Sequence, residues 1–274
     1  MSGSRTKSRL VVEIALWCST LLILIPLYFV IVNSLKSATE VQMMTAKLPA
    51  VFHFNNYVEV LKKANVPRAF MNSAIFSISS IVVCAVLSSM ASYILVRRNT
   101  RINGMIFNLF LVGMIAPMNM VTTFKLMKTL HLINSYYGII LLYAASFIPF
   151  TIFLYNSFIR NLPTDLDEAG VIDGAGPLRR YISILFPLLK PVTATAMVIN
   201  FVGCWNDFVF PLYFVTESSK WGVILLLYQF IGAYYSRHDL LFAGATMIAL
   251  PTLIVYLLGQ KYIISGMTAG AIKG

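Results

Sequence analysis

Charged residues are scarce in this sequence, and acidic residues are the scarcest of them. Of the 274 residues, 11% are charged and 58% are hydrophobic, and the mean hydropathy is +0.79. A soluble domain typically carries about 25% charged and about 45–50% apolar residues. The composition therefore excludes an ordinary soluble domain and predicts a protein of the lipid bilayer.

Cysteine and histidine are also too few and too scattered for chemistry that needs them in groups. The three cysteines lie far apart inside apolar runs, which argues against a disulfide framework and a CxxC metal site. His53, His131 and His238 are each isolated, with no second ligand at metal spacing. Basic residues are more numerous, but they cluster at the ends of apolar runs and do not interleave with exposed aromatics. We therefore expect neither a metal site nor nucleic-acid binding.

Long apolar runs, by contrast, recur along the whole chain. A helix needs about 20 apolar residues to cross a hydrocarbon core about 30 Å thick. Six segments meet this requirement, at residues 11–33, 73–96, 105–124, 137–159, 192–214 and 240–262. The first run extends to about Val32, which is too long for the apolar part of a cleaved signal peptide, so it is interpreted as a retained span. The sequence predicts an all-α integral membrane protein with six transmembrane helices, and one domain over residues 1–274.

The basic residues predict the orientation of these spans. An even number of spans places both termini on one side, and more than half of the 21 lysines and arginines fall on that side. Positive charge in short connections marks the cytoplasmic face of a membrane protein. Both termini, and the segment at residues 160–191 between the fourth and fifth spans, are therefore expected to be cytoplasmic.

The segment at 160–191 carries the clearest local signals. Thr164 is an expected N-cap, followed by three acids in the first helical turn, and Gly174 is expected to end that helix. Pro177 suits the first position of a second short helix. In that helix Leu178, Tyr181, Ile182 and Leu185 have the spacing of one apolar face. Two interpretations stay open at this point: a docking surface for a basic partner, or an amphipathic loop lying on the membrane.

The same segment resembles the permease subunits of bacterial ATP-binding-cassette importers. Their cytoplasmic signature is Glu-Ala-Ala, three residues, Gly, nine residues, Ile, one residue, Leu-Pro. This chain has Glu168-Ala169-Gly170, Gly174, Ile184 and Phe186-Pro187 at that spacing, with Gly170 and Phe186 as the two departures. The resemblance implies a coupling helix between the fourth and fifth spans that is seated on a separate ATPase. Its contact residues would be Glu168, Ala169, Gly170, Asp173, Gly174, Ile184 and Pro187.

The resemblance also implies the partners. The chain has no GxxxxGK[ST] phosphate-binding loop, so ATP and magnesium would be bound by partner ATPase subunits and no cofactor by this chain. Two ATPases, a second homologous permease and an extracellular or periplasmic solute-binding protein are expected, in a bacterial cytoplasmic membrane. The chain itself is expected to be a transporter subunit and not an enzyme, because no catalytic constellation accompanies its intramembrane acid, Asp207.

Further stretches resemble the sugar-importer branch, specifically the second permease of the maltose-type heterodimer. They include WNDFVFPL at Trp205–Leu212, NNYVEVL at Asn55–Leu61 and the terminal QKYIISGMTAGAIKG. The expected solute is a sugar or oligosaccharide, and the alternative is another polar solute such as a glycerol phosphate ester or an amino acid.

Two groups outside the cytoplasmic segment have two interpretations each. Trp205, Asn206 and Asp207 lie within the fifth expected span, where they could line a sugar path or form a polar cluster that packs helices. The outer segment at 216–239 is rich in aromatic residues, which could form an aromatic belt at the membrane surface or contact the binding protein. The candidates for that contact are Trp221, Tyr228, Tyr234 and Tyr235.

Overall fold

The computed structural model describes the chain as a set of helices in two compact units. The backbone is described at residues 2–63, 65–116, 118–228 and 237–271, and the side chains within these ranges except at 2–9, 11, 63 and 263–271. No strand occurs in the described ranges, which confirms the all-α prediction. The first unit comprises residues 1–67 and 226–250, and the second comprises residues 68–225 and 251–274.

Apolar helices of membrane-crossing length account for most of the chain. In the described ranges, the single helices that qualify are Val12–Ser34, Val66–Arg97, Tyr136–Ile159 and His238–Tyr262. Two bent pairs qualify when each is taken as one span, Arg101–Ile115 with Met120–Thr129 and Pro177–Leu188 with Lys190–Trp205. The chain thus has four to six candidate spans, as a multi-pass membrane protein requires.

The first unit begins with α1 (Ser2–Ser34) and continues through a 3-10 turn, η1 (Glu40–Met43), and α2 (Asn55–Lys63). It also holds the end of α12 (Val223–Leu227) and the first part of α13 (His238–Ala271). Large apolar side chains along α1, such as Leu16, Trp17 and Leu22, are exposed, as expected for a helix surrounded by lipid.

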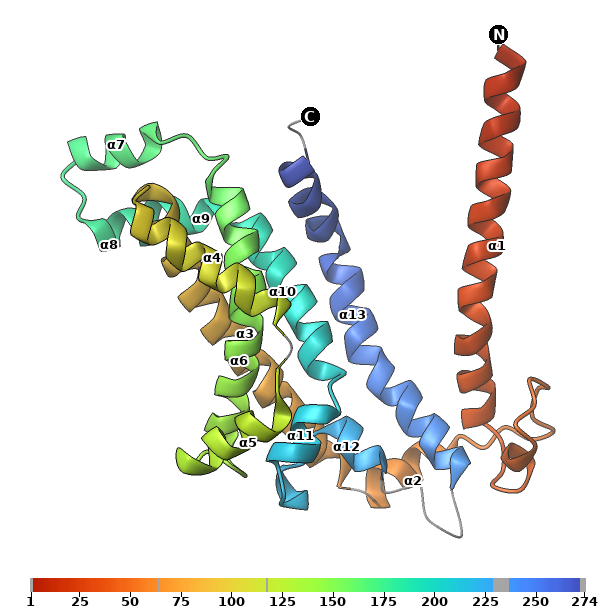
Figure 1. Ribbon diagram of the computed structural model, residues 1–274. Coiled ribbons are helices and arrows are strands. Elements are labelled where there is room, and N and C mark those ends of the chain that lie inside the picture. Colours follow the sequence, from red (N-terminus) through yellow and green to blue (C-terminus); the bar gives the residue numbers. More distant parts are fainter. Residues whose placement is uncertain (1, 64, 117, 229–236, 272–274) are drawn as a thin grey trace. The chain divides into compact units, whose positions relative to one another are not determined.

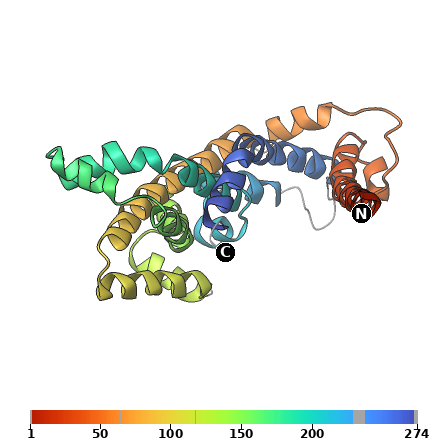
Figure 2. The same ribbon diagram turned by 90° about the horizontal axis from the view of Figure 1, so that it is seen from above.

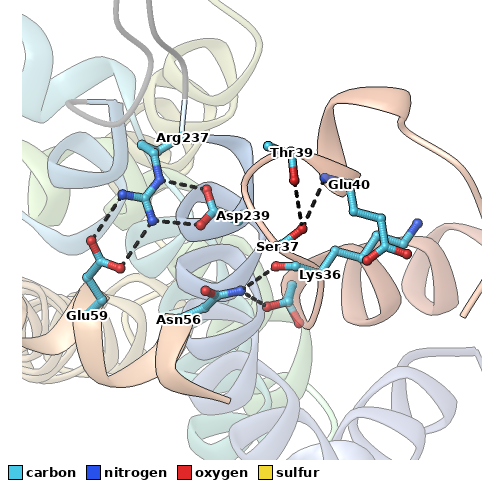
Figure 3. Close-up of polar contacts among 9 residues, drawn as sticks. Lys36, Ser37, Thr39, Glu40, Asn56, Glu59, Arg237 and Asp239 are labelled. Carbon is cyan, nitrogen blue, oxygen red and sulfur yellow. Dashed lines mark hydrogen bonds and ion pairs between the residues drawn. The ribbon is translucent and has the colours of Figure 1, made fainter. Parts of the chain in front are cut away.

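Polar contacts fix the end of α1 within this unit (Figure 3). The Nζ of Lys36 is fully buried and donates to Asn33 Oδ1 at 3.0 Å and to Thr45 Oγ1 at 3.1 Å. Asn56 Nδ2, on α2, donates to the carbonyls of Ser34 and Lys36, each at 2.9 Å. Since a buried cation without hydrogen bonds is costly, these contacts determine where the chain leaves α1.

An ion-pair network in the first unit joins α2 to the start of α13 (Figure 3). The Arg237 guanidinium donates to both oxygens of Glu59 at 3.1 Å and pairs with Asp239 at 2.7 Å. Asp239 is almost fully buried. The hydrogen bonds that Arg237 donates to Asp239 and, second, to Glu59 raise the pKa of Arg237 above its ordinary value, so the arginine stays charged.

The second unit contains the remaining helices. They are α3 (Val66–Arg97), α4 (Arg101–Ile115), α5 (Met120–Thr129), α6 (Tyr136–Ile159), α7 (Asp165–Ile172), α8 (Pro177–Arg180), the π-helix η2 (Tyr181–Leu185), α9 (Phe186–Leu188), α10 (Lys190–Trp205), α11 (Val209–Phe214) and the 3-10 turn η3 (Ser218–Lys220), with the later part of α13. In Figures 1 and 2, α3, α6 and α10 lie side by side, and α7 lies at one extremity of the unit.

Small polar residues bring α3 and α6 into close contact. Ser80 Oγ donates to the Ile140 carbonyl and Ser92 Oγ to the Ile152 carbonyl, both at 3.2 Å. Both serines are fully buried. Serine at a helix interface allows close approach of the two backbones, which is typical of packing within membranes.

The expected span at 192–214 is interrupted in the structure. Helix α10 ends at Trp205, and the short helix α11 starts at Val209. Asp207 accounts for this break, because its Oδ1 and Oδ2 accept the backbone N–H groups of Val209 and Phe210 at 3.0 Å each. A carboxylate that caps the first N–H groups of a helix makes that position a helix start.

Candidate functional site

The segment at 160–191 folds as the two short helices that its sequence predicts. Helix α7 ends in a Schellman motif, in which Ala175 N–H donates to the Gly170 carbonyl at 2.9 Å and Gly174 N–H to the Val171 carbonyl at 3.0 Å. Gly174 has a φ of +71°, which L side chains rarely adopt. Thr164 stands at the N-cap position, but its side chain makes no capping hydrogen bond there, contrary to expectation.

One face of α7 is fixed to the end of α3 by an ion pair. Asp167 Oδ2 lies 2.7 Å from Arg97 Nε, with the two side chains 17% and 14% exposed. Asp167 Oδ1 accepts the hydroxyl of Tyr93 at 2.8 Å. Arg97 also donates to the carbonyls of Leu162 at 3.2 Å and Pro163 at 3.3 Å. Arg97 therefore holds both the chain entering α7 and the helix itself.

Gly170 lies on the same face of α7 and packs against the following helices. The residue is buried, and a Cβ at this position would lie 2.8 Å from Ile184 Cδ1 and 3.0 Å from Arg180 Cγ. Two positions of the expected contact set, Gly170 and Ile184, thus touch each other inside the segment. The glycine that departs from the family signature permits this close approach.

Pro187 explains the unusual turn that precedes it. Proline has no N–H, so the carbonyl four residues earlier lacks its α-helical donor. Immediately upstream, η2 is a π-helix, in which the Phe186 N–H donates to the Tyr181 carbonyl five residues back. Such turns are rare and change the angular spacing of side chains.

This π-helix divides the apolar face predicted for the second short helix. Tyr181 and Leu185 are buried, but Leu178 and Ile182 are 62% and 54% exposed. Of the four residues predicted to share an apolar face, the structure therefore buries two and leaves two exposed. The buried pair packs with Tyr155 of α6 in a cluster that anchors the segment to the spans.

The opposite face of α7 is exposed and chemically mixed. Ile172 is 85% exposed, which is high for a large apolar side chain. The other exposed positions of this face from the expected contact set are Glu168, Ala169 and Asp173. Pro187, farther along the segment, is exposed as well. We name the exposed residues Glu168, Ala169, Ile172 and Asp173 the outer face of α7. An apolar side chain flanked by carboxylates suits a partner groove that is apolar with a basic rim.

Trp205, at the end of α10, and the two residues that follow it have three different environments. Trp205 is 5% exposed and stacks on Phe201, with ring centroids 5.3 Å apart. Asp207 accepts the Tyr143 hydroxyl at 2.8 Å in addition to capping α11. Asn206 is exposed, and its Nδ2 donates to the Val202 carbonyl at 2.9 Å. Asn206 is thus the member of this group that presents its side chain at a surface of the described chain.

The candidate aromatic residues of the outer segment are described in part. Trp221 belongs to the second unit, where its Nε1 donates to the Val215 carbonyl at 3.1 Å. Tyr228 belongs to the first unit and is 58% exposed. Tyr234 and Tyr235 lie outside the described residues.

Two polar residues near the start of α3 form hydrogen bonds with the outer segment, a role that was not predicted from the sequence. Asn72 Nδ2 donates to the carbonyls of Ser219 at 3.1 Å and Trp221 at 2.9 Å. Ser73 Oγ accepts the Val223 N–H at 2.9 Å. These contacts span about 150 residues of sequence, so local patterns could not reveal them.

An exposed carboxylate ties the same loop to the start of α6. Glu217 pairs with Lys220 at 3.1 Å and accepts Asn134 Nδ2. Hydrogen bonds from Lys220 and then from Asn134 hold the pKa of Glu217 below its ordinary 4.5. The folded loop therefore favours the charged form of Glu217.

Metal-ligating residues do not gather in the described ranges. Within them, no group of three or more histidine, cysteine, aspartate or glutamate side chains lies close enough to hold an ion.

Comparisons with known proteins agree on one family. Residues 89–268 match the family described as "Binding-protein-dependent transport system inner membrane component". The chain is 33% identical to the melibiose/raffinose/stachyose import permease protein MelC of Bacillus subtilis, covering 100% of both chains. It is 35% identical to the multiple sugar-binding transport system permease protein MsmG of Streptococcus mutans, covering 92% of this chain and 93% of that one.

A solved structure has the same fold. It is a chain of a bacterial ABC transporter involved in the import of the acidic polysaccharide alginate, with a TM-score of 0.85 and 22% identity. The similarity covers 96% of this chain and 98% of that chain.

Proposed function

The chain belongs to the family of binding-protein-dependent transport system inner membrane components, and we propose that it is the permease subunit of an ATP-driven importer for a sugar or oligosaccharide. Two relatives with assigned sugars support this solute class. MelC is named for melibiose, raffinose and stachyose, and the uptake permease NgcG of Streptomyces coelicolor, 32% identical, is named for diacetylchitobiose.

The coupling role belongs to α7 and rests on one observation. Asp167 and Gly170 hold one face of the helix against α3 and the following helices, and the outer face is exposed. A rigid helix that is anchored on one side and exposes an acidic and apolar surface on the other is suited to a partner groove. In the proposed complex, Glu168 and Asp173 meet basic groups of the ATPase and Ile172 enters its groove.

Energy for transport would come from those partners. ATP and magnesium are proposed to bind to two separate ATPase subunits, because the chain has no phosphate-binding loop of its own. A second, homologous permease would complete the path, and a solute-binding protein would deliver the solute. We propose six spans, the fifth of which includes α10 but not the short helices before it, both termini cytoplasmic, and residence in the bacterial cytoplasmic membrane.

Of the residues at 205–207, Asn206 is proposed to face the solute. Its amide is exposed and can both donate to and accept from sugar hydroxyls. Asp207 is proposed to act indirectly, because its oxygens already accept from Tyr143 and from the α11 backbone. An Asp207→Ala variant should lose assembly before it loses uptake per assembled complex.

The outer segment is proposed as the contact for the binding protein. Trp221 is anchored by its indole, and Tyr228 offers an exposed ring. Tyr234 and Tyr235 follow in the same stretch of sequence and are proposed as further contact residues.

The decisive experiment reverses the charge of Glu168. In the complex with its natural partners, Glu168→Arg should abolish ATPase co-purification or sugar uptake while the chain still inserts in the membrane. Arg179→Glu is the matched control, because it reverses one exposed charge on α8 that is not at a fixed position of the motif. Normal uptake and co-purification in Glu168→Arg would refute the coupling role. Uptake of an amino acid or a glycerol phosphate ester, and no uptake of any sugar in a panel, would refute the solute class.

A further inference from the structure

Two cavities adjoin one another where α3 meets α8. One, of about 250 Å³, is lined by Met90, Tyr93, Ile94, Pro177, Leu178 and Tyr181. The other is about 500 Å³ and shares Tyr93, Ile94 and Pro177 with the first. It is also lined by Arg97, Arg98, Asp167, Glu168 and Arg180. The two cavities therefore form one continuous site with an apolar end and a charged end.

The charged end has a net positive charge. Arg97 and Asp167 pair with each other, which leaves Arg98 and Arg180 against the single carboxylate of Glu168. The Nε of Arg180 is buried and has no hydrogen-bond partner among the described residues. A buried donor without a partner is costly, so the charged end is suited to an anion that accepts from guanidinium groups.

The apolar end requires a ligand that is more than a free anion. Met90, Ile94 and Leu178 are 39%, 51% and 62% exposed, and they line the smaller cavity side by side. A soluble phosphate at the arginines would leave these side chains uncovered. A ligand with a hydrocarbon chain attached to its anionic group would cover them.

The site also lies at the depth where such a ligand is found. The candidate span of α3 ends at Arg97, so the arginines are at the membrane surface, while Met90 and Ile94 lie within the apolar span. Basic pockets between membrane helices on the cytoplasmic side bind anionic lipid headgroups.

We propose that this site binds an anionic phospholipid of the cytoplasmic leaflet. Its phosphate accepts from Arg98 and Arg180, and one acyl chain lies along Met90, Ile94 and Leu178. The leaflet assignment rests on the topology given under the proposed function. The bound lipid joins the end of α3 to α8, so the seating of the coupling segment depends on the lipid composition of the membrane.

The test uses the complete transporter in nanodiscs. One preparation contains phosphatidylcholine alone, and the other an equimolar mixture with phosphatidylglycerol. Lipid that stays bound after transfer to detergent is identified by native mass spectrometry, and sugar-stimulated ATP hydrolysis is measured in both preparations. The wild-type complex should retain phosphatidylglycerol in preference to phosphatidylcholine and hydrolyse ATP faster in the mixture.

Two pairs of variants separate the two ends of the site. Arg98→Gln with Arg180→Gln should lower phosphatidylglycerol retention about fivefold for each arginine. Arg179→Gln is the control, since Arg179 is exposed beside Arg180 and lines neither cavity. Leu178→Glu should also lower retention, whereas Ile182→Glu should not, because Ile182 is similarly exposed but lines neither cavity.

Three results would overturn the site: equal retention in the arginine variants and their control, equal retention of both lipids by the wild type, or displacement of the lipid by inorganic phosphate alone. Because retention is measured as bound lipid mass and not as uptake, its loss is independent of transport. If the wild type bound phosphatidylglycerol through these residues but failed to co-purify with an ATPase, the proposed function would be refuted and the lipid site would still be supported.

Discussion

The ion pair between Arg97 and Asp167 offers the sharpest test of how α7 is held. Replacing Arg97 with Gln removes a 2.7 Å charge contact and two hydrogen bonds to the chain that enters α7. Breaking a fully buried pair from one side costs about 3–5 kcal/mol, and an exposed pair contributes about 0–1 kcal/mol. Since roughly a sixth of each side chain is exposed, a cost of about 2 kcal/mol is expected.

That cost should appear as local opening of α7. A change of about 2 kcal/mol raises the population of the opened helix about 30-fold, so the amide groups of residues 165–172 should exchange hydrogen about 30-fold faster. Hydrogen–deuterium exchange of the complex, read by mass spectrometry over the α7 peptide, measures this directly. Transport should fall more than ATP hydrolysis, because a displaced helix no longer transmits movement.

A double-mutant cycle shows whether the pair itself is responsible. Asp167→Asn alone should also accelerate exchange, and the variant with both substitutions should be less affected than the sum of the single variants. Arg101→Gln, which removes an exposed charge at the start of α4, should leave α7 unchanged. Unaltered exchange in Arg97→Gln, or strict additivity in the cycle, would refute this account of how α7 is seated.

Three further predictions follow from particular contacts. Gly170→Leu should cost about 1–3 kcal/mol by overpacking and lower uptake, whereas Gly170→Ala should be nearly normal because its single methyl group meets only the flexible side chains of Ile184 and Arg180; uptake assays compare the two. Arg237→Ala leaves Asp239 buried without its partner, so the apparent melting temperature should fall by the equivalent of about 3 kcal/mol. Glu217 has a lowered pKa in the folded chain, so its contribution is complete above pH 4.5 and is lost as the pH falls through the lowered value; wild type and Glu217→Gln should converge in stability in acid.

The features of the segment at 160–191 that could be predicted from sequence are those set by local rules. The left-handed turn at Gly174 and the helix start at Pro177 depend on the conformational preferences of single residues, and both are found in the structure. The six apolar runs likewise required only a count of residues against the thickness of a bilayer. Four of them coincide with single long helices.

What could not be predicted depends on contacts between distant parts of the chain. From the sequence, Arg97 contributes only to the predicted orientation of the spans, because no local pattern links it to an aspartate 70 residues later. The helix break at Asp207 is of the same kind, since the carboxylate is held by Tyr143 on another helix. A hydropathy scan sees both residues as charges at or within a span and gives them no partner.

If α7 has the proposed coupling role, its contacts indicate how movement of this helix would reach the spans. Arg97 connects α7 to α3 through an ion pair. Gly170 lies against η2, whose Tyr181 is bonded to Ser89 of α3 at 2.7 Å and packs with Tyr155 of α6. Movement of α7 therefore acts on α3 at two points and on α6 at one. Because close-packed contacts deform little, these helices are expected to move with α7 as one body and not to bend around it.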